Sequence, residues 1–114
     1  MACEPADIET ASPAYAERFA GAVGAWMLKV QEEAVLDLLR GDRGVAILDV
    51  GGGHGQLADP LCRAGYTVTV VGSAACCAQR IAHLVDGGRC RFQTADLLRL
   101  PFPDRAFDTV LCFR

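Results

Sequence analysis

The 114-residue chain is long enough for one small domain with a single hydrophobic core and too short for two. Hydrophobic residues make up 52% of it and charged residues 22%, which excludes the composition of a disordered protein. The 11 Lys and Arg against 14 Asp and Glu give a net charge of −3 without a basic run, so we expect no nucleic acid as a partner.

The N-terminal segment carries no targeting signal that we recognise. Residues 1–11 are acidic and lack the basic and apolar regions of a signal peptide. No stretch of the sequence approaches the roughly 18 apolar residues of a membrane-spanning helix. We therefore expect a cytoplasmic protein with no membrane partner.

Residues 1–44 are predicted to form a leader followed by cap helices. Ser12 and Pro13 suit the N-cap and the first position of a helix. Beyond them apolar residues recur every three or four positions, as in one amphipathic helix or two in tandem with a break at Gly21 and Gly24. We expect this apolar stripe to pack on a sheet, and a lid over a substrate is the alternative. Its members are Tyr15, Phe19, Val23, Trp26, Met27, Val30, Ala34 and Leu38.

Residues 45–114 are predicted to form a half-domain of alternating strands and helices. Short apolar runs alternate with helical segments, which is typical of βαβ units with a parallel sheet. The strands are apolar throughout, as expected where helices cover both faces of a sheet. We expect strands at 45–50, 67–71, 90–93 and 107–113, and helices at 56–64 and 74–85.

Pro60 conflicts with the helix expected at 56–64, because a proline inside a helix costs about 3 kcal/mol. In the alternative, Asp59 and Pro60 start the helix, which then becomes very short before Gly65. We expect a helix that is kinked at Pro60.

The six cysteines are many for a chain of this length. They form no Cys-x-x-Cys pair, and neither His54 nor His83 stands at a spacing from a cysteine that zinc sites use. Several lie in apolar stretches such as 109–113, where cysteine behaves as a small buried hydrophobe. We expect no metal site, and reduced, buried thiols at Cys3, Cys62, Cys76, Cys77, Cys90 and Cys112.

A glycine-rich turn follows the first expected strand. The sequence of residues 47–55, ILDVGGGHG, places a carboxylate near the strand end and glycines after it, which let a backbone approach a ligand closely. Nucleotide-binding oxidoreductases use a related G-x-G-x-x-G turn that holds a pyrophosphate. Asp49 would repel a pyrophosphate and attract a cationic amino group. The residues therefore favour an amino-acid-like cofactor over NAD.

Residues 48–55 resemble motif I of class I S-adenosylmethionine-dependent methyltransferases, D-x-G-x-G-x-G. Residues 64–71 resemble the second strand of these enzymes, and residues 93–110 resemble the D-x-x-x-L-P-F-x-D-x-x-F-D-x-V run that leads into their fourth strand. Three motifs in the right order are more specific than one. The resemblance implies an α/β fold: a Rossmann-like, doubly wound parallel sheet, incomplete here, with strands in the order 3-2-1-4 and N-terminal helices.

The resemblance implies S-adenosyl-L-methionine as the cofactor and assigns roles by position. Asp49 faces the methionine amino group. Asp96 accepts a hydrogen bond from the adenine amino group, with the Leu97 amide beside the ring; for both aspartates the alternative is a capping or turn carboxylate. Asp108 is expected to be structural, and His54 to contribute its backbone. The glycines that shape the loop beside the cofactor are Gly51, Gly53 and Gly55.

The end of the second strand departs from the family pattern. Related enzymes have an acidic residue there that holds the ribose hydroxyls, whereas this chain has Gly72 followed by Ser73. A hydroxyl offers a neutral hydrogen bond worth about 1 kcal/mol, against roughly 1.5–3 kcal/mol for a bond to a charged acceptor. We expect Gly72 and Ser73 to border the ribose and cofactor binding to be weaker than usual.

The resemblance implies the cofactor-binding portion of a methyltransferase that acts on an acceptor, expected to be a small molecule. Two alternatives remain open: a non-catalytic cofactor-binding or scaffold fragment completed by another chain, and an NAD-binding oxidoreductase domain. Because the family's acceptor-binding residues follow the fourth strand, we expect the chain alone to be inactive. The apolar residues 109–113 would form a sheet edge that promotes self-association.

Overall fold

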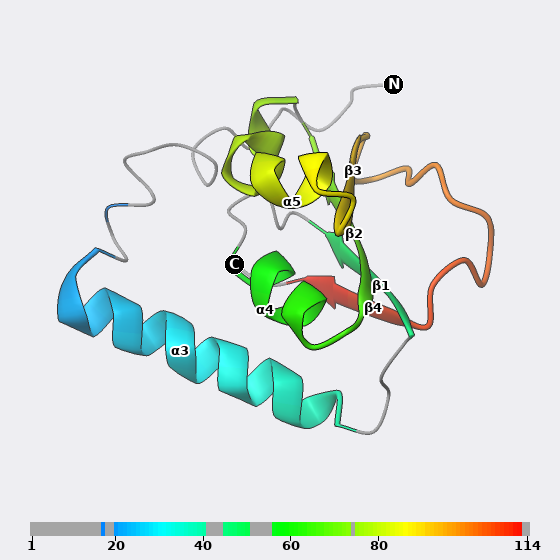
Figure 1. The fold of residues 1–114 in the computed structure, drawn as a ribbon. Helices are drawn as coiled ribbons and strands as arrows, with labels where there is room; N and C mark the ends of the chain where they lie inside the picture. The colour runs from blue at the N-terminus through cyan, green and yellow to red at the C-terminus, as the bar shows by residue number, and fades with distance from the viewer. Residues whose placement is uncertain (1–16, 18–19, 41–44, 51–55, 74, 113–114) are drawn as a thin grey trace.

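Four parallel strands form the centre of the fold, with helices packed against them (Figure 1). The computed structural model describes residues 17, 20–40, 45–50, 56–73 and 75–112. In chain order the elements are α3 (Gly21–Leu38), β1 (Ala46–Val50), α4 (Ala58–Arg63), β2 (Thr67–Gly72), the 3-10 helix η1 (Ala75–Ile81), α5 (Ala82–Asp86), β3 (Cys90–Thr94) and β4 (Thr109–Cys112).

The strand order is β3-β2-β1-β4, and each pair of neighbours is parallel. This confirms the predicted α/β class and the order 3-2-1-4. Because side chains alternate along a strand, Ile47 and Asp49 of β1 point to the same face of the sheet. The register sets Asp49 opposite Val70 of β2 and Leu111 of β4. A carboxylate therefore stands among apolar neighbours.

The hydrophobic core lies between one face of the sheet and the short helices. Ile47, Val68 and Val70 of the sheet pack with Leu61 of α4 and Leu84 of α5, and all five are buried. Full burial of a side chain of this kind contributes roughly 1.5–3 kcal/mol. These contacts hold α4 and α5 on the sheet.

Helix α3 joins the same core through its C-terminal half. Val35 and Leu39 are buried in the core, and the Tyr66 hydroxyl donates a hydrogen bond to the Leu39 carbonyl oxygen at 2.9 Å. Tyr66 directly precedes β2, so the end of α3 is fixed at the amino end of the strands. The division into residues 1–44 and residues 45–114 stays a prediction.

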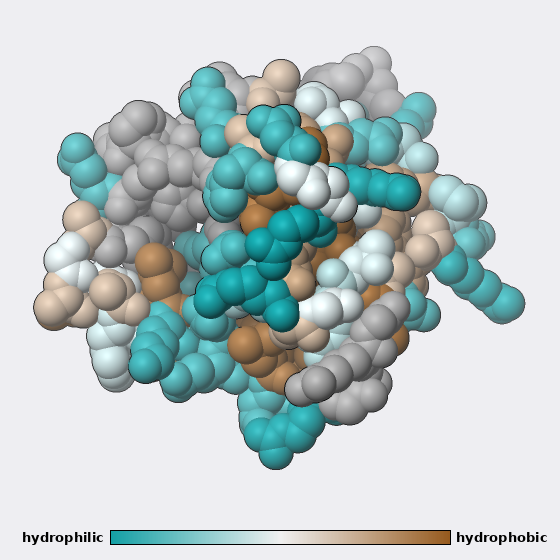
Figure 2. All heavy atoms as spheres, viewed as in Figure 1, coloured by the Kyte–Doolittle hydropathy of each residue, from teal (hydrophilic) through white to brown (hydrophobic). Residues whose placement is uncertain are grey.

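The apolar stripe of α3 does not pack on the sheet, contrary to our expectation. Trp26 is 65% exposed, and Val23, Met27, Val30 and Leu38 are also exposed. Figure 2 shows apolar side chains at the surface where α3 lies in Figure 1. The buried face is instead the one that carries Val35, about a third of a turn around the helix from the centre of the stripe. Tyr15 and Phe19 lie outside the described residues.

Three expectations about helices need correction. The break expected at Gly21 and Gly24 is wrong at Gly24, which is buried inside α3, while Gly21 begins the helix with a φ of +82°. The kink expected at Pro60 is also wrong. Helix α4 begins only at Ala58, so Pro60 lies in the first turn, where a backbone N–H has no partner within the helix. The helix expected at 74–85 is a 3-10 helix up to Ile81 and an α-helix thereafter.

Candidate functional site

Asp49 is the only charged side chain buried in the described part of the chain, with 1% of its surface exposed. Its Oδ1 has no hydrogen-bond partner among the described residues. Burial disfavours the ionised carboxylate and raises its pKa from the ordinary 3.8 to about 6. A buried acceptor without a donor costs free energy, so this position is not explained by folding alone.

The chemistry of Asp49 suits a cationic ligand. A positively charged amino group beside the carboxylate would donate to Oδ1 and compensate the lost hydration. A pyrophosphate would add negative charge to a buried carboxylate. The alternative of a capping or turn role for Asp49 stays open, because residues 51–55, which such a role would involve, lie outside the described residues. The site therefore fits a ligand with an ammonium group.

Gly72 and Ser73 lie beside Asp49 at the carboxyl ends of the strands. Val50 pairs with Val71, so Gly72 follows at the level just beyond β1. Its carbonyl oxygen accepts a hydrogen bond from the Ala95 amide at 2.9 Å, which joins β2 to the end of β3. The φ of Gly72 is not in the left-handed region, so its backbone allows a side chain.

Asp96 lies in a turn after β3. Its Oδ1 accepts a hydrogen bond from the Leu98 amide at 3.0 Å, and its carbonyl oxygen accepts one from the Arg99 amide at 2.9 Å. Leu97 is half-buried in the same turn. Asp96 thus acts as a turn carboxylate through Oδ1, as the alternative interpretation expected. Its second carboxylate oxygen can still accept a hydrogen bond from a ligand.

Gly51, Gly53, Gly55 and His54 of the expected glycine-rich turn lie outside the described residues. The residues on either side, Val50 and Gln56, place the turn at the carboxyl end of β1. The carboxyl ends of parallel strands are where α/β proteins bind ligands.

Asp108 has the structural role that we expected. Its Oδ2 accepts a hydrogen bond from the Ala46 amide at 2.8 Å, and its own amide donates to the Ala46 carbonyl oxygen at 2.9 Å. These bonds fix β4 to the start of β1. They lie at the opposite end of the sheet from Asp49's carboxylate and take no part in the site.

Two further side chains carry buried oxygens that sequence reasoning did not single out. Gln31 Oε1 on α3 and Gln56 Oε1 before α4 have no hydrogen-bond partner among the described residues. Neither glutamine belongs to a recognisable sequence motif, so only the burial of the side-chain oxygen in the structure draws attention to it.

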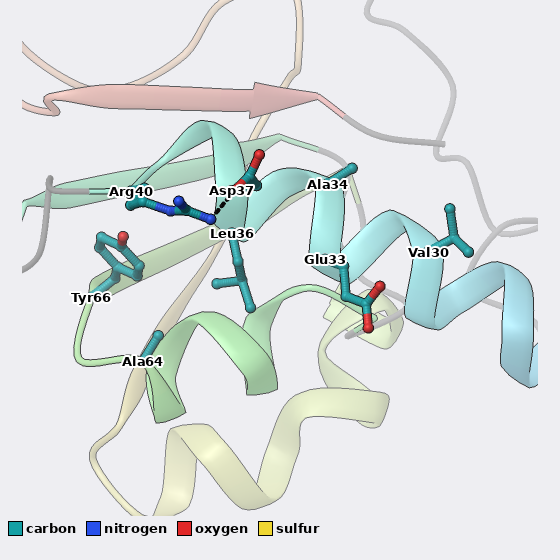
Figure 3. A pocket seen from close by; sticks show the side chains of 8 residues that line it. All are labelled: Val30, Glu33, Ala34, Leu36, Asp37, Arg40, Ala64 and Tyr66. Carbon is teal, nitrogen blue, oxygen red and sulfur yellow. Dashed lines mark hydrogen bonds and ion pairs between the residues drawn. The ribbon is translucent and has the colours of Figure 1, made fainter.

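A groove of about 720 Å³ lies elsewhere, between the C-terminal half of α3 and the segment that leads into β2 (Figure 3). Arg40 and Asp37, which form an ion pair, line it together with Tyr66. Tyr66 precedes β2, so this groove lies toward the amino ends of the strands. It is therefore separate from the candidate site at the carboxyl ends.

The described cysteines only partly match the expectation of buried thiols. Cys62, Cys90 and Cys112 are free, and Cys90 is buried, but Cys62 is half-buried and Cys112 is exposed. Cys112 was expected inside the apolar run 109–113; it is exposed because strand alternation turns it to the opposite face from Leu111. In the part of the chain that the structure describes, no cluster of His, Cys, Asp and Glu side chains is placed to hold a metal.

Helices long and apolar enough to cross a membrane are missing from the described ranges.

Comparisons with solved structures identify the fold. Magnesium protoporphyrin IX methyltransferase from Synechocystis PCC 6803, solved with S-adenosylmethionine bound, has a TM-score of 0.69 at 22% identity over 92% of this chain and 58% of its own. The [4+2]-cyclase SpnF has a TM-score of 0.61 at 30% identity over 70% of this chain and 32% of its own. Coclaurine N-methyltransferase has a TM-score of 0.56 at 22% identity over 71% of this chain and 26% of its own.

This chain thus spans between about a quarter and three fifths of the length of those structures. A search of the curated proteins gives no significant match. The profile of the methyltransferase domain family matches residues 47–114, which include all of β1 except its first residue, and the described strands β2, β3 and β4. The chain belongs to the methyltransferase domain family.

Proposed function

We propose that this chain forms the cofactor-binding portion of an S-adenosyl-L-methionine-dependent methyltransferase that acts on a small-molecule acceptor. The observation that carries the proposal is the buried Asp49 carboxylate with its unpartnered Oδ1. Family membership and the similarity to a methyltransferase solved with S-adenosylmethionine bound support it.

We assign the cofactor-binding residues from their positions in the sequence motifs of the family. Asp49 holds the ammonium of the methionine group, and the glycines Gly51, Gly53 and Gly55 form the turn beside it. The second carboxylate oxygen of Asp96 accepts from the adenine amino group next to Leu97, and Gly72 and Ser73 border the ribose. When bound, the cofactor supplies a methyl group carried on a sulfonium. These residues orient that methyl group and limit the access of water.

The acceptor is selected by residues beyond this portion of the fold. The chain spans 58% of the Synechocystis methyltransferase and less of the others. The similarity to a [4+2]-cyclase favours a second candidate, a cofactor-fold module that does not transfer a methyl group, completed by another chain. We also propose a cytoplasmic location and self-association through the edge strand β4.

Calorimetry on the chain with S-adenosylmethionine, S-adenosylhomocysteine and NAD tests the proposal. We expect binding of the first two and not of NAD. Asp49→Asn removes the charge that attracts the ammonium, and we expect a loss of about 10- to 100-fold in affinity, equivalent to roughly 1.5–3 kcal/mol. The control Asp104→Asn changes an exposed loop carboxylate and should leave affinity unchanged. Binding of NAD, or full affinity in Asp49→Asn, would contradict the assignment.

A further inference from the structure

Gln31 places an uncompensated acceptor inside the molecule. Its Oε1 is buried and has no hydrogen-bond partner among the described residues. Nothing in the packing of α3 requires a polar atom there, because the buried positions on that side of the helix, Gly24 and Val35, are apolar. A buried acceptor is retained at a cost in stability unless a ligand supplies the missing donor.

Helix geometry puts Gln31 on the inward face of α3. Gln31 follows the buried Gly24 by seven residues and precedes the buried Val35 by four, which is about two turns and one turn of an α-helix. Residues at these spacings lie on one side of a helix. Val35 belongs to the core cluster that also contains Leu57 and Ala58 at the start of α4. Gln31 therefore faces the body of the molecule.

The direction of α3 brings Gln31 toward the carboxyl ends of the strands. The end of the helix is held at the amino end of β2 by the bond between Tyr66 and Leu39. Helix α3 and strand β4 run in opposite directions in Figure 1, where the β4 arrow points left and the blue N-terminal end of α3 lies at the left. The N-terminal end of α3 therefore lies toward the carboxyl ends of the strands. Gln31 lies about 12 Å along the helix from Leu39, which is about the length of the five-residue strand β1. Gln31 is therefore displaced from the amino end of the strands by about the length of one strand.

Gln56 lies just before α4, in the segment that follows β1. It is the first described residue after the segment that leaves β1, and the next residue, Leu57, is buried in the core. Its Oε1 is also buried and without a partner in the described residues. The three unpartnered acceptor oxygens are on Gln31, Asp49 and Gln56. Each of these residues stands within four residues along the chain of a member of one core cluster, Val35, Ile47 or Leu57 respectively.

We propose that Gln31 and Gln56 bind the ammonium of the cofactor's amino-acid group together with Asp49. An ammonium carries three N–H donors, and each of the three oxygens accepts one. This inference rests on the proposed function, because it assumes a ligand with an amino-acid group. It adds the N-terminal helix α3 to the binding machinery and makes Gln31 a specificity-determining residue for that part of the ligand.

The test compares two ligands that differ only in that group. S-adenosylhomocysteine carries the amino acid, and 5′-deoxy-5′-methylthioadenosine has the same nucleoside without it. In calorimetry, we expect Gln31→Leu to bind S-adenosylhomocysteine about tenfold more weakly and the methylthio compound as tightly as the unmodified chain does. Gln56→Leu should behave in the same way.

Two matched variants serve as controls. Gln31→Glu retains the acceptor oxygen at the same reach and should keep the binding of S-adenosylhomocysteine. Glu33→Gln, on the exposed side of the same helix, should change the affinity for neither ligand. A melting temperature for each variant identifies any that fails to fold, and Gln56→Leu then replaces Gln31→Leu.

The outcomes separate this inference from the proposed function. If the unmodified chain binds S-adenosylhomocysteine but Gln31→Leu and Gln56→Leu bind it equally well, the inference alone is overturned. An equal loss for both ligands also overturns it, since the side chains would then act through the fold. If the unmodified chain binds neither ligand, the proposed function falls and the inference with it.

Discussion

A single residue, Asp49, joins the stability of this fold to its proposed chemistry. Apolar side chains from β2 and β4 stand on either side of it, and its pKa is raised to about 6 by burial. In the ligand-free protein at neutral pH, the buried ionised carboxylate lowers the free energy of unfolding. A bound cation would compensate this loss of stability. Removal of its charge should therefore stabilise the ligand-free chain while it weakens binding.

The pH dependence of Asp49→Asn tests this cost. The folded-state pKa of about 6 lies above the ordinary 3.8, so the folded protein holds the proton longer than the unfolded chain does. The stability linked to this group is complete below pH 3.8 and is lost as pH rises through 6. At pH 7.5 we expect Asp49→Asn to be more stable by up to about 3 kcal/mol, and at pH 3.5 to match the unmodified chain. Urea denaturation at both pH values measures the difference; equal stability at pH 7.5 would contradict the expectation.

At the scale of the elements, two attachments decide how helix α3 and strand β4 lie on the rest of the fold. Helix α3 is held by two buried side chains and by the Tyr66 hydrogen bond at its end. Strand β4 is held by its pairing with β1 and by the Asp108 carboxylate. Each attachment makes a distinct prediction.

Tyr66→Phe should loosen α3. The change leaves the ring in place but removes the donor to the Leu39 carbonyl oxygen, at a cost of about 1 kcal/mol in the free energy of unfolding. Hydrogen exchange should rise at the amides of α3 and stay unchanged in β2. An unchanged urea midpoint together with unchanged exchange would mean that packing alone holds the helix.

The surface of β4 is apolar at Val110, not at Leu111. The sequence predicted that the apolar residues 109–113 form a sheet edge that promotes self-association. Within this run the structure packs Leu111 against the core and leaves Val110 60% exposed. Val110→Lys should therefore reduce self-association, because a charged edge strand resists pairing.

Leu111→Lys is the matched counterpart, and it should unfold the chain by burying a charge. Sedimentation velocity compares the association of the two variants, and circular dichroism checks their folding. A Val110→Lys chain that associates as strongly as the unmodified one would exclude this face of β4 as the contact.

At the scale of the whole molecule, the described sheet carries the proposed cofactor site and has β4 at one edge. The order β3-β2-β1-β4 makes β4 an edge strand in the described residues. In the proposed function, methyl transfer needs an acceptor aligned with the cofactor in a site that excludes water, which residues beyond β4 would complete.

The 114-residue chain alone should therefore bind cofactor without turnover. Transfer of a radiolabelled methyl group to a panel of small-molecule acceptors measures this, with calorimetry in parallel to establish that the cofactor is bound. A compact monomer that methylates an acceptor at an ordinary enzymatic rate would overturn the expectation. Residues of the N-terminal helices would then have to form the acceptor site.

Much of this molecule was predictable from sequence because its signals are local. Apolar runs separated by helical segments predicted the four strands, and the order 3-2-1-4 followed from the family resemblance that the motifs carried. Asp49 was chosen as a candidate by its position before a glycine-rich segment; the structure shows that it is buried, and its binding role stays a prediction. Asp108 was recognised as structural, and its bonds to Ala46 confirm this. A motif consists of residues close together in the sequence, so it can be recognised without the three-dimensional structure.

Only the tertiary structure decided which faces are buried. The period of α3 indicated an apolar stripe, yet the helix turns Gly24, Gln31 and Val35 inward and leaves Trp26 exposed. The alternation of β4 likewise assigned Leu111 to the core and Val110 to the surface. The physical reason is that burial is a property of contacts between segments far apart in the chain, such as the bond from Tyr66 to Leu39. A periodic pattern defines the sides of a helix or strand, and long-range packing selects the one that is covered.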